Sequence, residues 1–75
     1  MQKKSTVIQE DPENSLGERL RVRRKELKLS MKQVAISSGL SIGFISQVER
    51  GLTSPSLTSL TSIANFLKSD VSNFL

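Results

Sequence analysis

The amino-acid sequence predicts an all-α fold, a bundle of five short helices. Apolar residues recur three or four positions apart through most of residues 16–75, which is the spacing of one face of a helix. Serine stands directly before several of these stretches, where its side chain can accept a hydrogen bond from the first turn of a helix. Gly39 and Gly51 stand where two of the helices should end, because a helix often closes on a residue with a positive φ.

Length and composition narrow the possible functions. The 75 residues suffice for one small domain, and they include no cysteine and no histidine. Disulfides, thiolate metal sites and the usual general bases are therefore missing, so we expect neither an enzyme nor a protein that holds a metal or cofactor. No apolar run has the length of a membrane span, and no apolar segment follows the basic start as in a signal peptide. We therefore expect a cytoplasmic protein.

The formal net charge of +4 is unevenly placed along the chain. Residues 1–14 contain two lysines and three acidic residues and lack helical periodicity, so we predict a flexible leader. Within it, only residues 6–8 could add a short strand or dock on the rest of the chain. Residues 15–75, the predicted domain, contain nine basic and four acidic side chains. This excess suits a polyanionic partner, although a basic surface can equally serve solubility.

The first helix should begin at Leu16 and end near Leu27 or Lys28. Ser15 and Glu18 form a capping box, in which the serine accepts from the third helical N–H and the glutamate reaches back to the serine N–H. The expected apolar stripe consists of Leu16, Leu20 and Leu27, closed by Leu29. Other basic residues of this helix are expected to face solvent: Arg19, Arg21, Arg23, Lys25 and Lys28.

The second and third helices are expected over residues 31–38 and 42–50. Ser30 and Gln33 form a second capping box at the start of the second helix, and Ser41 can cap the third.

The turn between these two helices is the most informative part of the sequence. Gly39 permits the positive φ that a tight turn between helices needs, and Ala35 is small enough to let the second helix cross closely. Ile45 follows at a buried position of the next helix. This spacing is typical of a helix-turn-helix, so DNA binding becomes the leading hypothesis.

Two charged residues occupy positions where an unpaired charge is unfavourable. Arg24 interrupts the apolar stripe of the first helix, where an unpaired charge would be costly. Glu49 lies in the last turn of the third helix, where the helix dipole disfavours an anion. Each position is explained if the other residue pairs with it, so we predict a structural ion pair.

The last two helices follow a loop over residues 53–56. The regular apolar spacing argues for a helix from 57 to 67, rather than a disordered tract rich in serine and threonine. Its apolar face is expected to comprise Leu57, Leu60, Ile63, Ala64 and Leu67. Asp70 should cap a short final helix from Val71 to Leu75, which ends on the apolar Phe74 and Leu75.

The side of the third helix that faces away from Ile45 and Val48 is expected to contact DNA bases. A glutamine can pair with adenine, a serine can serve several bases, and an isoleucine can meet a thymine methyl group. The predicted base-reading residues are Ser41, Ile42, Gly43, Ser46 and Gln47. An ordinary solvated helix face is the alternative interpretation.

Residues 16–75 resemble the Xre/Cro/CI family of phage-repressor-like DNA-binding domains. The resemblance rests on LGERLRVRRKELKLSMKQVAISSGLSIGFISQVERG followed by TSPSLTSLTSIANFL, and most specifically on ERG at 49–51, SPSL at 54–57 and IA at 63–64. It implies a five-helix, lambda-repressor-like bundle that regulates transcription. Such a protein binds double-stranded DNA as a homodimer, on a palindromic operator. It also implies that Arg24 and Glu49 form a buried ion pair.

One position departs from the family pattern. Many members place a glutamine first in the second helix, where it contacts a phosphate and braces the first side chain of the third helix. Met31 stands there in this chain, and Ile42 replaces the polar side chain that would be braced, so we expect apolar readout at the outer end of the site. The predicted phosphate-binding residues are Ser30, Met31, Lys32, Arg50, Thr53 and Ser54.

The same bundle is also compatible with a protein-interaction module such as an antitoxin. Binding to DNA would weaken steeply with salt, which separates the two functions. In the family a sensing or oligomerising domain commonly follows such a bundle, so we expect this chain to belong to a longer protein. Alone, it should be monomeric or weakly dimeric through its last helix, and should bind DNA with micromolar affinity.

Overall fold

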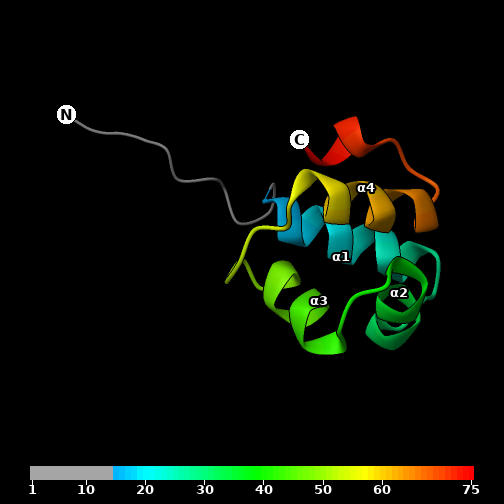
Figure 1. Ribbon diagram of the computed structural model, residues 1–75. Helices are drawn as coiled ribbons and strands as arrows, with labels where there is room; N and C mark the ends of the chain where they lie inside the picture. Colours follow the sequence, from blue (N-terminus) through cyan, green and yellow to red (C-terminus); the bar gives the residue numbers. More distant parts are fainter. Residues whose placement is uncertain (1–14) are drawn as a thin grey trace.

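The computed structural model describes residues 15–75, and this part of the chain is helical without any strand (Figure 1). The elements are α1 (Leu16–Glu26), α2 (Met31–Ser38), α3 (Ile42–Glu49), α4 (Leu57–Phe66) and the 3-10 helix η2 (Val71–Phe74). The all-α class is confirmed. The predicted leader over 1–14 lies outside the described residues, so the division of the chain at residue 15 stays a prediction.

The predicted bundle of five helices is confirmed only for four α-helices among the described residues, because the last element is a single 3-10 turn of four residues. Its backbone bonds span three residues, as in the 2.9 Å bond from the Asn73 N–H to the Asp70 carbonyl. The Asp70 side chain makes no cap hydrogen bond, which contradicts its predicted role. The segment is too short for an α-helix, and it turns so that Phe74 is buried.

Serine caps begin all four α-helices. The hydroxyls of Ser15, Ser30, Ser41 and Ser56 each accept from the backbone N–H three residues ahead, at 3.0–3.2 Å. At α2 the capping box is complete, because Gln33 accepts from the Ser30 N–H at 2.8 Å. The predicted starts of the four helices are therefore confirmed, and their predicted ends differ by about one residue, which is within normal fraying.

Each α-helix is followed, one or two positions after its last residue, by a residue with a positive φ. Gly39 and Gly51 have φ of 70° and 76°, as predicted, and Lys28 and Lys68 take the same role after α1 and α4 with φ of 59° and 57°. The residue after each donates its N–H to a carbonyl five residues back, at 2.8–3.1 Å. A Cβ added to either glycine would meet nothing within 4 Å, so these turns need glycine for its backbone conformation alone.

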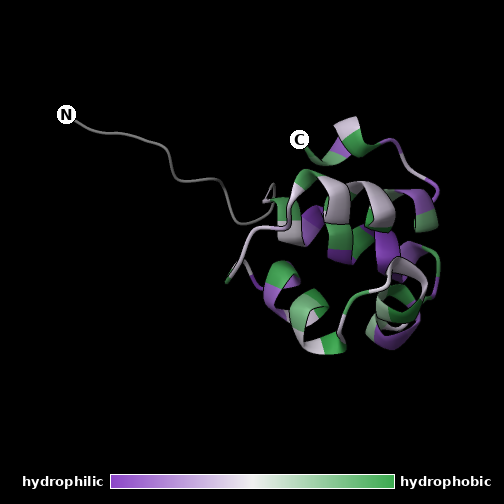
Figure 2. Ribbon diagram, in the orientation of Figure 1, coloured by the Kyte–Doolittle hydropathy of each residue, from purple (hydrophilic) through white to green (hydrophobic). Residues whose placement is uncertain are grey.

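The five elements pack in a closed ring. In order, α1 packs on α3, α3 on α2, α2 on α4, α4 on η2, and η2 returns to α1. Figure 2 shows apolar residues on every helix of this ring. The buried core inside it comprises Leu20, Val34, Ala35, Ile45, Val48, Leu60, Ile63, Ala64, Leu67 and Phe74.

Some residues predicted for the core lie outside it. Leu57 is 63% exposed, because it stands in the first turn of α4 at the edge of the apolar stripe. Leu75 is also exposed, whereas Leu16, Leu27 and Leu29 are partly buried and pack against the core. Within residues 15–75, no helix is long and apolar enough to span a membrane.

Candidate nucleic-acid interface

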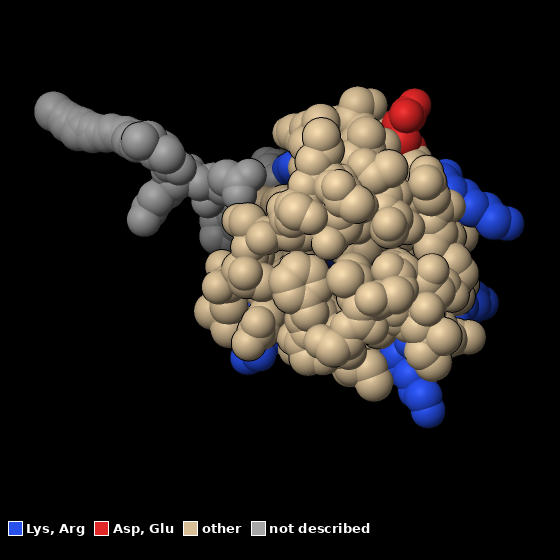
Figure 3. Space-filling model, viewed as in Figure 1, with Lys and Arg blue, Asp and Glu red and all other residues tan. Residues whose placement is uncertain are grey.

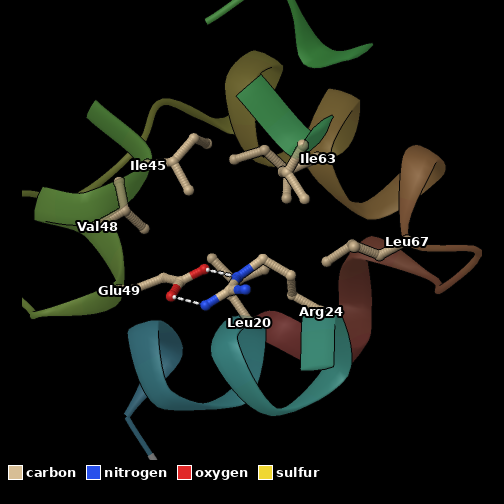
Figure 4. Close-up of a pocket in the computed structure, with 8 residues that line it drawn as sticks. Leu20, Arg24, Ile45, Val48, Glu49, Ile63 and Leu67 are labelled. Atoms are coloured by element: carbon tan, nitrogen blue, oxygen red, sulfur yellow. Dashed lines mark hydrogen bonds and ion pairs between the residues drawn. The ribbon is translucent and has the colours of Figure 1, made fainter. Parts of the chain in front are cut away.

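The predicted ion pair between Arg24 and Glu49 is present and buried. Arg24 Nε and Nη2 donate to the two carboxylate oxygens of Glu49 at 2.7 and 2.9 Å (Figure 4). Arg24 Nη1 also donates to the Leu29 carbonyl at 2.9 Å. The pKa of Arg24 is raised, chiefly because the Glu49 side chain accepts its hydrogen bonds, although burial acts in the opposite direction. The pair links the last turn of α3 to α1.

Gly17 brings α1 into backbone contact with the same turn of α3. A Cβ at this position would lie 2.3 Å from the Val48 carbonyl oxygen and 2.7 Å from that of Glu49. Only a residue without a side chain allows this approach. Gly17 was not among the predicted packing residues, although a glycine inside a helix costs about 1 kcal/mol relative to alanine and so signals a packing requirement.

A small space of about 10 Å³ lies between the ion pair and the core (Figure 4). Apolar side chains from all four α-helices line the rest of it: Leu20, Val34, Ile45, Val48, Ile63 and Leu67. This volume is at the lower limit for one water molecule, so the space cannot hold a small-molecule effector.

The two sides of α3 differ in exposure, as predicted. Ile45, Val48 and Glu49 are buried, whereas the predicted base-reading residues are accessible. Ser41, Ile42, Gly43 and Gln47 are exposed, and Ser46 is half-buried. In Figure 1, α3 lies at the surface of the bundle beside α2.

The residues predicted to bind phosphates lie on the first turn of α2 and on both sides of Gly51. Ser30, Lys32, Arg50 and Ser54 are exposed, and Met31 and Thr53 are half-buried. The Arg50 side chain lies along α3, with Nε donating to the Ser46 carbonyl at 3.4 Å. None of the eleven predicted DNA contacts is buried, and their contact with DNA stays a prediction.

Two arginines predicted to face solvent instead bind the C-terminal part of the chain. Arg23 donates to the carbonyls of Leu67 and Lys68, at 2.9 and 3.4 Å, and Arg19 donates to the Phe74 carbonyl at 3.3 Å. The carbonyls at a helix end lack partners within the helix, so they attract such donors. The prediction is correct for the exposed Arg21, Lys25 and Lys28.

The remaining charge does not gather in one place on the visible face. Figure 3 shows basic side chains spread around the rim of the molecule. Within residues 15–75, no group of three or more acidic, cysteine or histidine residues is placed to hold a metal ion.

The fold and the exposed second helix of the motif define a helix-turn-helix protein. Residues 20–74 match the helix-turn-helix family HTH_3, and the chain belongs to this family. The resemblance to the Xre/Cro/CI group is thereby confirmed.

The chain is similar to several transcriptional regulators. It is 44% identical over 50 residues to the HTH-type transcriptional regulator DdrOP3 of Deinococcus deserti. The aligned residues make up 67% of this chain and 39% of the relative. It is 36% identical over 58 residues to the immunity repressor of Bacillus phage phi105, covering 77% and 40%. The chain thus spans about two fifths of the length of these relatives.

Solved structures show the same arrangement of helices. The P22 c2 repressor in complex with a synthetic operator has a TM-score of 0.78 at 34% identity, over 81% of this chain and 92% of that one. The restriction-modification controller protein C.AhdI of Aeromonas hydrophila has a TM-score of 0.77 at 32% identity, over 80% and 91%.

Proposed function

We propose that this chain binds double-stranded DNA sequence-specifically through α3 and regulates transcription in the cytoplasm. The observation that carries the proposal is the division of α3 into a buried side, fixed to α1 by the Arg24–Glu49 pair, and an accessible side. Family membership and the operator-bound P22 c2 repressor support the same function.

In this proposal α3 enters the major groove with its N-terminal end first. Gln47 pairs with an adenine, and Ser46 contacts a neighbouring base. Phosphates are bound by the first turn of α2, with Ser30, Met31 and Lys32, and by the segment after α3, with Arg50, Thr53 and Ser54. The phosphate contacts orient the domain, while the base contacts select the sequence.

We further propose that two copies bind one palindromic operator. One chain presents one α3, and a dimer would read two half-sites about 34–36 Å apart. No cofactor is needed for this mode of binding.

The test is selection of bound sequences from a random DNA pool, followed by titration with salt. We expect an enriched palindrome with half-sites one helical turn apart, and an affinity that falls steeply with salt as counterions are released. A pool that yields no motif would refute sequence-specific binding.

The alternative is a protein-interaction module. The surface available to such a module is an open groove of about 320 Å³ between α1 and η2, lined mostly by charged and polar residues together with Val22 and Phe74. Such a module would retain its partner at salt concentrations that release DNA.

A further inference from the structure

The leading end of α3 offers little besides an apolar side chain once its serine has capped the helix. The Ser41 hydroxyl caps the helix by accepting from the Phe44 N–H at 3.0 Å. Ile42, the first residue of α3, is 48% exposed. Gly43 has no side chain, and a Cβ there would meet nothing within 4 Å. The first turn of α3 therefore offers a base pair an apolar branched side chain with open space beside it.

Only one feature of a base edge in the major groove is apolar, the methyl group at C5 of a pyrimidine. Thymine carries this methyl group, whereas unmodified cytosine does not. An isoleucine has no donor or acceptor, so it cannot distinguish the O4 of thymine from the N4 amino group of cytosine. Its contact depends on the methyl group alone.

We propose that Ile42 recognises the C5 methyl group of a pyrimidine, and that thymine and 5-methylcytosine are therefore bound alike at one position of each half-site. The inference rests on the proposed function and names a chemical modification to which the site responds. Methylation of a cytosine at this position would strengthen binding.

The geometry of α3 also places this position relative to the base read by Gln47. Ile42 and Gln47 are five residues apart, which is about 7.5 Å along a helix. Successive bases of one strand are separated by about 3.4 Å. The methyl-bearing base should therefore lie about two base pairs from the one whose preference is lost in Gln47→Ala.

The test uses the selected operator in four versions, with thymine, deoxyuridine, cytosine or 5-methylcytosine at each pyrimidine in turn. At one position we expect the protein to bind the operators with thymine and 5-methylcytosine about fourfold more tightly than those with deoxyuridine and cytosine. This ratio corresponds to burial of about one methyl-sized group. The difference should disappear in Ile42→Ala, and should persist in Ile42→Val and in Gln47→Ala. Circular dichroism checks that each variant stays helical.

Several results would overturn the inference. One is a selected motif that contains no thymine at this spacing, and another is equal binding of thymine and deoxyuridine operators at every position. A third is a preference for the methyl group that persists in Ile42→Ala. These results leave the proposed function standing if a motif was selected. If no motif is selected from the pool, the proposed function fails as well.

Discussion

On its inner side α3 presents Ile45, Val48 and Glu49, all buried, to the other helices. On its outer side the same eight-residue helix presents Ile42 and Gln47, both exposed. The inner residues can only affect how firmly the helix is held, whereas the outer ones can affect what it binds. Stability and specificity can therefore be changed separately within one helix, and the substitutions below test this separation.

The largest effect is expected from breaking the buried ion pair. Arg24→Met leaves the Glu49 carboxylate buried without a partner, so the free energy of unfolding should fall by about 3–5 kcal/mol. Replacing both residues, as Arg24→Met with Glu49→Met, should recover most of this loss. Urea unfolding followed by circular dichroism measures both, since the chain lacks tryptophan and tyrosine. A coupling energy near zero in the double-mutant cycle would show that the two side chains act independently.

A smaller effect is expected where α1 contacts the backbone of α3. Gly17→Ala places a methyl group against the Val48 carbonyl and should destabilise the protein by about 1–3 kcal/mol, despite the better helix propensity of alanine. Gly43→Ala is the matched control on the outer side of α3. Its methyl group meets nothing, so it should stabilise by about 0.5–1 kcal/mol. If urea unfolding showed that both substitutions change the free energy of unfolding in the same direction, the assigned packing would be contradicted.

The outer side of α3 is tested by Gln47→Ala. Affinity for the selected operator should fall by about 1–3 kcal/mol with the preference lost at one base position, because a bidentate contact is removed. The urea midpoint should not change, because Gln47 is exposed. The matched control is Lys32→Ala, which should weaken binding to all sequences alike and reduce the salt slope by about 1. Unchanged affinity of Gln47→Ala for both specific and random duplexes would mean that another surface reads the DNA.

The smallest loss of stability is expected at the end of α3. Gly51→Ala should cost about 1 kcal/mol in the free energy of unfolding, because the residue has a φ of 76° and the added methyl group meets nothing. The loss would come from backbone conformation alone, so it should appear in thermal unfolding without a change in base preference. A change in base preference would show that the turn, and not only the outer side chains, sets specificity.

The parts of the fold that depend on neighbouring residues could be predicted from the sequence. Ser30 and Gln33 cap α2 through contacts within three residues, and Gly39 adopts the expected positive φ. The Arg24–Glu49 pair spans 25 positions, yet it was predictable because each charge is unfavourable in its own helix. A local conflict in the sequence thus pointed to a distant partner.

The partners of the contacts with the backbone were not predictable in this way, although a glycine inside a helix, as at Gly17, does signal a close approach. Arg19 and Arg23 donate to main-chain carbonyls, and Gly17 lies against carbonyl oxygens of α3. Every residue has a carbonyl group, so nothing in the sequence marks which ones accept. The exposure of Leu57 was also not predictable, because it stands at the edge of the apolar stripe in the first turn of α4, where periodicity alone does not decide burial.

The closed ring of elements determines how the described part of the chain can open. Because η2 joins α4 to α1, the first and last elements of residues 15–75 are neighbours, with Arg19 bonded to the end of η2 and Arg23 to the end of α4. No helix of the ring can leave without breaking contacts on two sides. Amide protons in α1, α2, α3 and α4 should therefore exchange with solvent through one shared opening event, with the protection of global unfolding. The exposed side of α3 would then be as slow to exchange as the core that supports it.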